Sequence, residues 1–206
     1  PTRGALVDLA AGTATDIWGD RDEFSGIRGV EGSDRDDRLL GSNTANTILG
    51  NWGDDRLAGR DGGDYLSGGN GTDTLDGGDG NDWAFFSEGN HGVIAYLGEG
   101  WARDAWLNQD TLVSIENVEG TDLDDEIRGS DVPNFLSGGG GNDRLSGWGI
   151  GDEFEPGPGT DEISGDSGIG DAYTDDDAAN VLWYADEDGA IDVFYDGPGK
   201  VREDWR

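Results

Sequence analysis

The stretch from Gly59 to Asp76 reads GRDGGDYLS-GGNGTDTLD, two successive phrases of nine residues with one layout. In each phrase glycine stands at position one, aspartate at position six and leucine at position eight. These are the fourth and fifth of six consecutive phrases, which begin at residues 32, 41, 50, 59, 68 and 77. A second run begins 88 residues later, at 120, 129, 138, 147, 156 and 165. A fixed short period of this kind predicts a repeat architecture, and one apolar residue in nine matches no helix.

Each phrase predicts a tight loop followed by a short strand. The first six positions are rich in glycine, which permits left-handed backbone, and the residue at position eight points inward from the strand. Two phrases make one coil, so each phrase stacks on the next but one at about 4.8 Å. The expected fold is all-β, a parallel β-roll of the right-handed β-helix-like solenoid type. The inward column is Leu39, Ile48, Leu57, Leu66, Leu75 and Ala84, then Ile127, Leu136, Leu145, Phe154 and Ile163.

The nine-residue phrases are nested in a unit of 88 residues. Residues 1–31 and 89–119 are expected to form β spacer or cap strands, and residues 32–88 and 120–179 two rolls. Residues 180–206 look like the start of a third unit, so the sequence suggests a piece of a longer tandem array. Val30 and Val118 lie nine residues before Leu39 and Ile127. We therefore expect the coil to continue one turn backwards from each roll.

Composition restricts what such a chain can do. Its formal charge is −33 and only 33% of its residues are hydrophobic, so we expect the chain to need bound cations and to be largely unfolded without them. The scattered arginines and single lysine argue against binding nucleic acid. Cysteine is absent, and no apolar run approaches the ~20 residues of a membrane span. A single histidine, His91, excludes two-histidine metal sites within these residues, and no G-x-S-x-G motif supports a serine hydrolase.

The loops offer the oxygen ligands that calcium prefers. Calcium takes six to eight hard oxygens at about 2.3–2.6 Å, and two stacked loops leave a slot of that size. Carbonyls of positions one to four would line the slot, and a carboxylate at position six of each loop would close it. The predicted metal-binding residues are Asp37, Gly50, Trp52, Gly53, Asp55, Gly59, Asp61, Gly62, Asp64, Gly68, Asn70, Gly71, Asp73, Gly77, Asp79, Gly80, Asp82, Asp125, Gly138, Gly140, Asp143, Asp152 and Asp161.

The stacking rule also ranks the expected calcium sites. The pairs Asp55–Asp73 and Asp64–Asp82 join the most regular loops and should bind most tightly. The pairs Asp37–Asp55 and Asp125–Asp143 come next. Sites that include Asn46 or Asn134 have one charge fewer and should be weaker. In the loop before Asp152, Ile150 replaces a glycine, which weakens the prediction there.

The phrases at residues 50–58, 59–67, 68–76, 77–85 and 138–146 resemble the haemolysin-type calcium-binding repeats of the RTX (repeats-in-toxin) family. The flanking VDLAAGTATD and SIENVEGTDLDDEIRGS resemble spacers of large bacterial RTX exoproteins. This resemblance implies Ca²⁺ as ligand, secretion from a Gram-negative bacterium by a type I system, an extracellular or cell-surface location, and folding outside the cell. Asn46, Asn134, Ile150, Pro156 and the phrase at Gly165 depart from the family pattern.

Three functions remain open at this level. The first is a non-enzymatic module that folds on binding calcium within a larger protein. The second is a segment of an adhesin or surface scaffold that binds glycans or a surface protein, for which Trp52, Trp83 and Trp148 could stack on sugars. The third is an accessory module of a secreted protease, lipase or epimerase. The repeats contain no catalytic motif, and they do not indicate an oligomeric state.

Overall fold

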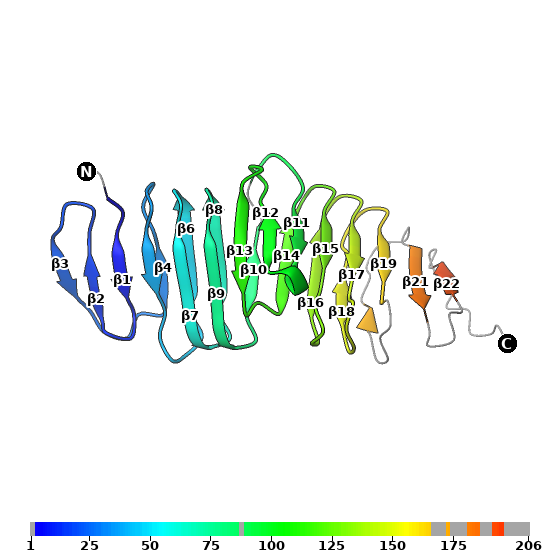
Figure 1. Ribbon diagram of the computed structural model, residues 1–206, viewed down its shortest axis with the longest axis horizontal. Helices are drawn as coiled ribbons and strands as arrows, with labels where there is room; N and C mark the ends of the chain where they lie inside the picture. The colour runs from blue at the N-terminus through cyan, green and yellow to red at the C-terminus, as the bar shows by residue number, and fades with distance from the viewer. Residues whose placement is uncertain (1–2, 87–88, 166–171, 174–180, 186–190, 196–206) are drawn as a thin grey trace.

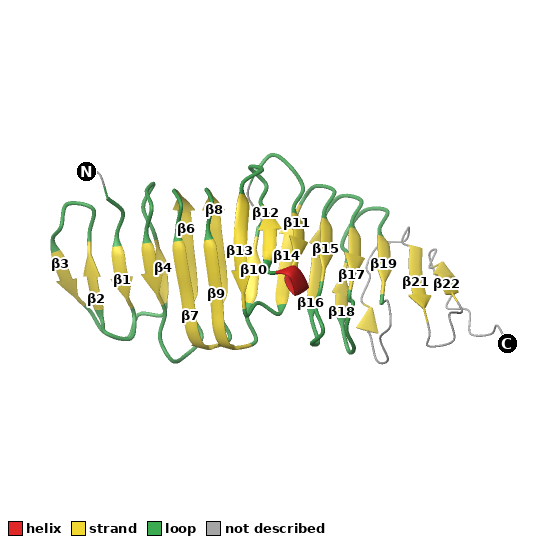
Figure 2. Ribbon diagram, in the orientation of Figure 1, coloured by secondary structure: helices red, strands yellow, loops and turns green. Residues whose placement is uncertain are grey.

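The computed structural model describes residues 3–86, 89–165, 172–173, 181–185 and 191–195. Strands succeed one another along one long axis (Figure 1). Among the described residues the one helical segment is the short 3-10 turn η1, Leu97–Glu99, and every other regular element is a strand (Figure 2). The chain is thus an all-β solenoid, as the sequence predicts. None of these residues forms a helix long and apolar enough to cross a membrane.

The strands form two sheets that run the length of the solenoid. In spatial order the larger sheet contains β3 (Arg21–Glu23), β2 (Thr13–Thr15), β1 (Leu6–Asp8), β5 (Arg38–Leu40), β7 (Arg56–Gly62), β9 (Thr74–Gly80), β13 (Gln109–Val113), β12 (Trp101–Arg103), β11 (Ile94–Tyr96), β15 (Glu126–Arg128), β17 (Arg144–Ser146), β19 (Glu162–Ser164), β21 (Val181–Ala185) and β22 (Ile191–Tyr195). The smaller sheet contains β4 (Gly29–Glu31), β6 (Thr47–Trp52), β8 (Tyr65–Asn70), β10 (Trp83–Phe85), β14 (Asn117–Thr121), β16 (Phe135–Gly139), β18 (Glu153–Glu155) and β20 (Ala172–Tyr173).

The register between strands follows the nine-residue period. Leu39 pairs with Leu57, and Leu57 with Leu75, so each phrase stacks in parallel on the next but one. Every residue of the predicted inward column is buried, with at most 2% of its surface exposed. The core is therefore a thin double row of apolar side chains between the sheets. Val30 pairs with Ile48 in the smaller sheet, which places β4 one turn before the first phrases.

The two blocks form one continuous solenoid. At their junction β13 pairs in parallel with β9, and β14 with β10, so the spacer extends both sheets of the first block. In the larger sheet β12 lies beside β13, and β11 beside β12, each antiparallel to its neighbour. Strand β11 then pairs in parallel with β15. The three strands β1, β2 and β3 repeat this arrangement 88 residues earlier. There β3 is an edge strand, and all three of its residues are exposed.

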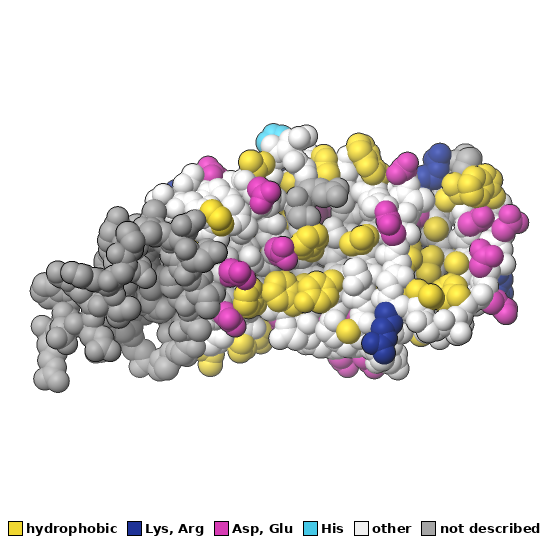
Figure 3. All heavy atoms as spheres, turned by 180° about the vertical axis from the view of Figure 1, so that it is seen from behind, with side chains coloured by type: hydrophobic (Ala, Val, Ile, Leu, Met, Phe, Trp, Pro, Cys, Tyr) yellow, Lys and Arg dark blue, Asp and Glu magenta, His cyan; other side chains and the backbone are white. Residues whose placement is uncertain are grey.

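Aromatic side chains pack along the outside of the smaller sheet. Trp83 stacks on Tyr65, with ring centroids 5.7 Å apart, and lies 5.1 Å from the ring of Phe135. The space-filling view shows hydrophobic side chains in a row along the solenoid, with acidic side chains around them (Figure 3). Trp83 is thus half-buried among neighbouring strands, whereas Trp52 and Trp148 are 58% and 51% exposed.

Part of the predicted organisation falls outside the described residues. The phrase that begins at Gly165 is described only at its first residue and at the short strand β20. Within residues 180–206, the proposed third unit, only the backbone strands β21 and β22 are described.

Candidate metal centres

The carboxylates at position six form a ladder along each edge of the solenoid. The backbone N–H of Asp37 donates to Oδ1 of Asp55 at 2.7 Å, and the N–H of Asp55 donates to Oδ1 of Asp73 at 2.7 Å. The other edge repeats the bond from Asp64 to Asp82, also at 2.7 Å. Each carboxylate therefore satisfies the backbone of the loop one turn before it. This arrangement holds one oxygen of each carboxylate in place and turns the other into its own loop.

In most loops that second oxygen is buried and accepts no hydrogen bond. This holds for Oδ2 of Asp55, Asp64, Asp73, Asp82 and Asp143. A buried carboxylate oxygen without a donor costs free energy unless a cation compensates it. The position-two residue in these loops has a left-handed backbone, with φ of 80° at Asn51 and 93° at Gly69, for example. Here no donor from position two reaches Oδ2. We call these loops open.

Four loops differ, and they are the first two of each block. Position two is then serine or threonine, and its backbone N–H donates to the side chain at position six. Ser33 donates to Oδ2 of Asp37, and Thr121 donates to Oδ2 of Asp125 at 2.6 Å. The amide oxygens of Asn46 and Asn134 accept the corresponding bonds from Ser42 and Ser130, both at 2.6 Å. We call these loops closed, because a backbone donor already fills the place where a cation would be needed.

Two carbonyls of the closed loops are also satisfied by protein groups. The guanidinium of Arg60 donates to the carbonyl of Gly41 at 2.7 Å and forms an ion pair with Asp8 at 2.9 Å. The side-chain amide of Asn51 donates to the carbonyl of Gly32 at 3.1 Å. In the first block, each of the two closed loops is therefore completed by a side chain from the loop that stacks on it one turn later.

Position one is glycine because a side chain would fill the slot between loops. A Cβ on Gly50 would stand 2.3 Å from Oδ2 of Asp55 and 2.5 Å from the carbonyl oxygen of Gly68. On Gly59 it would meet Oδ2 of Asp64 at 2.2 Å and the carbonyl oxygen of Gly77 at 2.7 Å. A carboxylate oxygen and a carbonyl oxygen from the next turn thus face the same small space. This donor set is the one that calcium prefers.

The electrostatics of the ladder oppose negative charge on these buried carboxylates. Burial raises the pKa of Asp55 to about 7, and the charges of Asp73 and Asp37 add to the shift. Burial and the charges of Asp125 and Asp161 raise the pKa of Asp143 to about 7. Burial likewise raises the pKa of Asp73 and of Asp82 to about 6. Without a cation, the folded loops hold their protons well above the pH at which exposed carboxyls lose them.

The described residues supply no protein cation to these carboxylates. Their ion pairs join Arg60 to Asp8, Arg128 to Glu126 and Arg144 to Glu162, all outside the ladder. In the same part of the chain, no three Asp, Glu, His or Cys side chains converge closely enough to hold a metal by themselves. Calcium in an open loop would therefore combine one or two carboxylates with backbone carbonyls. The buried oxygens fit such an ion.

The other predicted site residues stand at positions one, three, four and six of their phrases. Gly50, Gly59, Gly68, Gly77 and Gly138 at position one are all buried. At position three the side chains of Trp52, Asp61 and Asp79 are exposed and that of Asn70 is half-buried, so only their carbonyls could serve a site. Position four lies against the preceding turn, since a Cβ on Gly71 would stand 1.8 Å from the carbonyl oxygen of Gly53. The remaining predicted glycines are Gly62, Gly80 and Gly140, and Asp152 and Asp161 are buried members of the ladder.

Two ladder members in the spacer were not predicted. The N–H of Asp73 donates to Oδ1 of Asp110 at 2.8 Å, and the N–H of Asp82 donates to Oε2 of Glu116 at 2.9 Å. Asp110 and Glu116 thus take the place of the next position-six aspartates. The available signal was Leu112, which follows Asp110 by two residues as Leu75 follows Asp73. The spacing of six residues between Asp110 and Glu116 breaks the nine-residue period and so conceals this signal.

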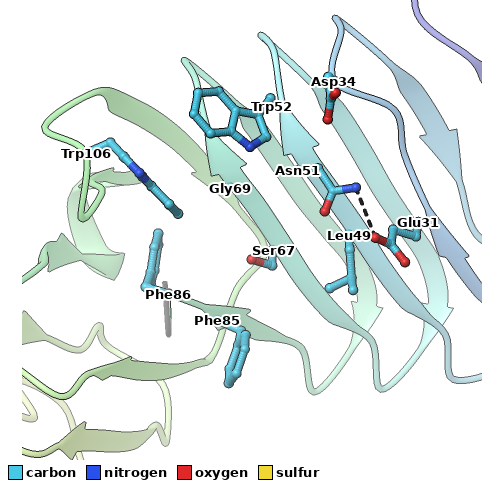
Figure 4. A pocket seen from close by; sticks show the side chains of 10 residues that line it. All are labelled: Glu31, Asp34, Leu49, Asn51, Trp52, Ser67, Gly69, Phe85, Phe86 and Trp106. Carbon is cyan, nitrogen blue, oxygen red and sulfur yellow. Dashed lines mark hydrogen bonds between the residues drawn. The ribbon is translucent and has the colours of Figure 1, made fainter. Parts of the chain in front are cut away.

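A shallow hollow of about 310 Å³ lies beside the open loops of the first block. Trp52 and Trp106 stand along one side of it, and Phe85 and Phe86 lie at its lower end (Figure 4). The side-chain amide of Asn51 donates to Glu31 at 3.3 Å in its wall. Aromatic and polar groups therefore share one surface depression.

Taken together, a parallel solenoid with a carboxylate ladder along its loops defines a β-roll of the cation-binding class. The family model of the RTX calcium-binding nonapeptide repeat, four copies long, matches residues 31–66, 59–90 and 119–149. These parts of the chain are RTX calcium-binding nonapeptide repeats, which confirms the resemblance of the nonapeptide phrases to that family. No curated protein matches the chain as a relative.

Proposed function

We propose that this chain is a non-enzymatic module that folds when calcium binds to its open loops. The proposal rests on the buried Oδ2 atoms of the open loops, since a folded loop without a cation leaves them uncompensated. Metal binding then contributes directly to folding. The formal charge of −33 supports the same conclusion, because bound cations offset repulsion between the turns.

The ions would lie between open loops that stack directly on one another. In the first block these are the loops that end at Asp55 and Asp73, and those that end at Asp64 and Asp82. In the second block the N–H of Asp143 donates to Oδ1 of Asp161 at 2.7 Å, and position two of both loops is left-handed. The closed loops that end at Asp37 and Asp125 would serve as metal-free starting turns rather than as the calcium sites expected from the sequence.

Circular dichroism during a calcium titration tests this function. In excess chelator at neutral pH the chain should lack the β signal, and millimolar Ca²⁺ should restore it reversibly. Millimolar Mg²⁺ is the matched control, since it demands a tighter octahedral shell and should be much less effective. A chain that has its full β signal in excess chelator would contradict the proposal.

The setting we propose is a larger protein secreted from a Gram-negative bacterium, in which this module folds outside the cell or on its surface. Calcium-dependent folding suits a chain that must leave the cell unfolded. The absence of cysteine fits an export route without disulfide formation, and the acidic composition keeps an unfolded chain soluble. Translocation from a bacterial host with a type I system, compared in strains with and without its transporter, checks this setting.

A second function, glycan binding, is favoured by the hollow that Trp52 and Trp106 line. Exposed aromatic rings next to an amide and a carboxylate are suited to the apolar face and hydroxyl groups of a sugar. A glycan array probed with the calcium-loaded chain should then give signals that Trp52→Ala removes. Trp148→Ala is the control, because Trp148 is similarly exposed but lies outside the hollow. Equal binding by both variants would exclude this role for the hollow.

A further inference from the structure

The spacer places an acidic loop directly on the last loop of the larger-sheet column in the first block. Strand β13 pairs with β9 so that Thr111 lies opposite Thr74 and Leu112 opposite Leu75. Asp110 therefore lies opposite Asp73, where the next nonapeptide aspartate would stand. Residues 104–110, DAWLNQD, contain no glycine and lie outside the stretches that match the repeat family.

Hydrogen bonds join the two loops as they join two calcium loops. The bond from the N–H of Asp73 to Oδ1 of Asp110, 2.8 Å long, matches the bond from Asp55 to Asp73 at 2.7 Å. The side-chain amide of Asn108 donates to Oδ1 of Asn70 at 3.0 Å, which ties position three of the lower loop to the spacer. The spacer loop thus reproduces the stacking of a nonapeptide loop with a different sequence.

The contact between these loops buries three carboxylates together. Asp73, Asp104 and Asp110 are each 1% exposed, and Oδ2 of Asp73 accepts no hydrogen bond. None of the three takes part in the ion pairs that the described residues form. Burial together with the charges of Asp73 and Asp104 raises the pKa of Asp110 to about 8. Asp104 is engaged by its own turn, since Oδ1 accepts from the N–H groups of Trp106 at 3.0 Å and Asn108 at 2.7 Å.

We propose that a calcium ion binds between the loop 68–73 and the spacer loop 104–110, with Asp73 and Asp110 as its carboxylate ligands. Backbone carbonyls of the two loops complete its shell, and the charge of Asp104 strengthens the attraction. This inference rests on the proposed function, and adds a site that the nonapeptide register does not contain. The ion would fasten the spacer, and through it the second block, to the end of the first.

The direct test counts calcium ions in two matched variants. In Asp110→Asn the amide oxygen can still accept from the N–H of Asp73, while one charge of the site is lost. Asp22 is the control, because it occupies the same place 88 residues earlier on the exposed edge strand β3. Equilibrium dialysis at saturating Ca²⁺ should find one ion fewer in Asp110→Asn and an unchanged number in Asp22→Asn. An unchanged number in folded Asp110→Asn would overturn the site.

A second measurement leaves every carboxylate in place, in case Asp110→Asn does not fold. Trp106 belongs to the spacer loop, so its indole should sensitise luminescence from Tb³⁺ bound in calcium's place. Trp106→Phe should lower the sensitised emission, with Trp148→Phe as the variant that keeps the emission from this site. Emission unaffected by Trp106→Phe would argue against the site even if the other loops bind. A wild-type chain that binds no calcium would overturn the proposed function, and this inference with it.

Discussion

At the scale of single residues, position two of each phrase decides what position six can do. Where position two is Ser33 or Thr121, its N–H reaches the carboxylate and the loop closes on itself. Where position two has a left-handed backbone, as at Arg60 and Gly78, no such bond forms and the carboxylate keeps a buried oxygen without a donor. The aspartate alone therefore does not identify a calcium loop. A serine or threonine four residues before it marks a loop in which the N–H of position two already bonds the side chain at position six.

The first prediction compares one aspartate from each kind of loop. Asp55→Asn keeps Oδ1 for the N–H of Asp37 but removes charge from an open loop. Since a hydrogen-bonded or ligating charge contributes about 1.5–3 kcal/mol, the calcium concentration at the folding midpoint should rise about tenfold or more. Asp37→Asn should change it by less than about threefold, because its loop is closed. Calcium titrations followed by circular dichroism measure both midpoints, and equal shifts would refute the distinction between the loops.

At the scale of strands, the sequence predicts the regular rungs and misses the hairpins. One apolar residue per phrase is enough to place Leu57 or Leu66 inward, because a strand alternates its side chains and the period fixes the register. The strands β11 and β12 carry no such period. Their place in the larger sheet depends on two pairings. Strand β11 pairs with β15, which lies far along the chain, and β12 pairs with β13 across an irregular turn. The ladder roles of Asp110 and Glu116 follow from the pairing of β13 with β9 and of β14 with β10, which the broken period conceals.

The second prediction concerns the core of one rung. Leu66 in β8 is fully buried between Ile48 and Ala84 of the neighbouring strands. Leu66→Ala should lower the free energy of unfolding of the calcium-loaded chain by about 2–5 kcal/mol, the usual cost of removing a buried leucine side chain. Leu123→Ala, at a loop position that is 42% exposed, should cost well under half as much. Denaturant unfolding at fixed Ca²⁺ measures both, and equal losses would argue against the inward column.

At the scale of the whole molecule, the solenoid is a row of turns whose strands pair only with those of adjacent turns. Its core is thin, and the carboxylate ladder lies along its loops, so stability comes from contacts between adjacent turns and from what binds between them. The spacer does not interrupt this row, because β13 and β14 stack on β9 and β10 in the same registers. Loss of calcium from any pair of loops should therefore weaken both adjoining turns.

The third prediction is that protons and calcium compete for the ladder. In the folded, metal-free form, burial raises the pKa of Asp55 and Asp143 to about 7 and that of Asp110 to about 8, above the ordinary value of 3.8. Between about pH 4 and pH 8 this form binds more protons than the unfolded chain, so its stability falls as pH rises through that window. In chelator, acidification from pH 8 to pH 5 should increase the β signal. A metal-free chain that loses β signal on acidification would contradict this.

Calcium binding should have the opposite pH dependence. In the folded metal-free form each ion must displace protons from the raised carboxyls, so the affinity of this form for Ca²⁺ should be lower at pH 5 than at pH 8. Calorimetric titration in two buffers of different ionisation enthalpy would detect the released protons. Binding to the folded metal-free form at pH 5 without proton release would be inconsistent with the raised pKa values of Asp73 and Asp82.

The ladder also has a direction. In each regular rung, the backbone N–H at position six belongs to the earlier loop and the carboxylate that accepts it lies 18 residues later, as in the bonds Asp37–Asp55 and Asp125–Asp143. In these position-six bonds, the donor of an earlier loop is therefore satisfied by the carboxylate of a later one. Each position-six N–H of the ladder thus depends on the loop that follows it, so a turn added at the carboxyl end satisfies a backbone donor of the turn before it.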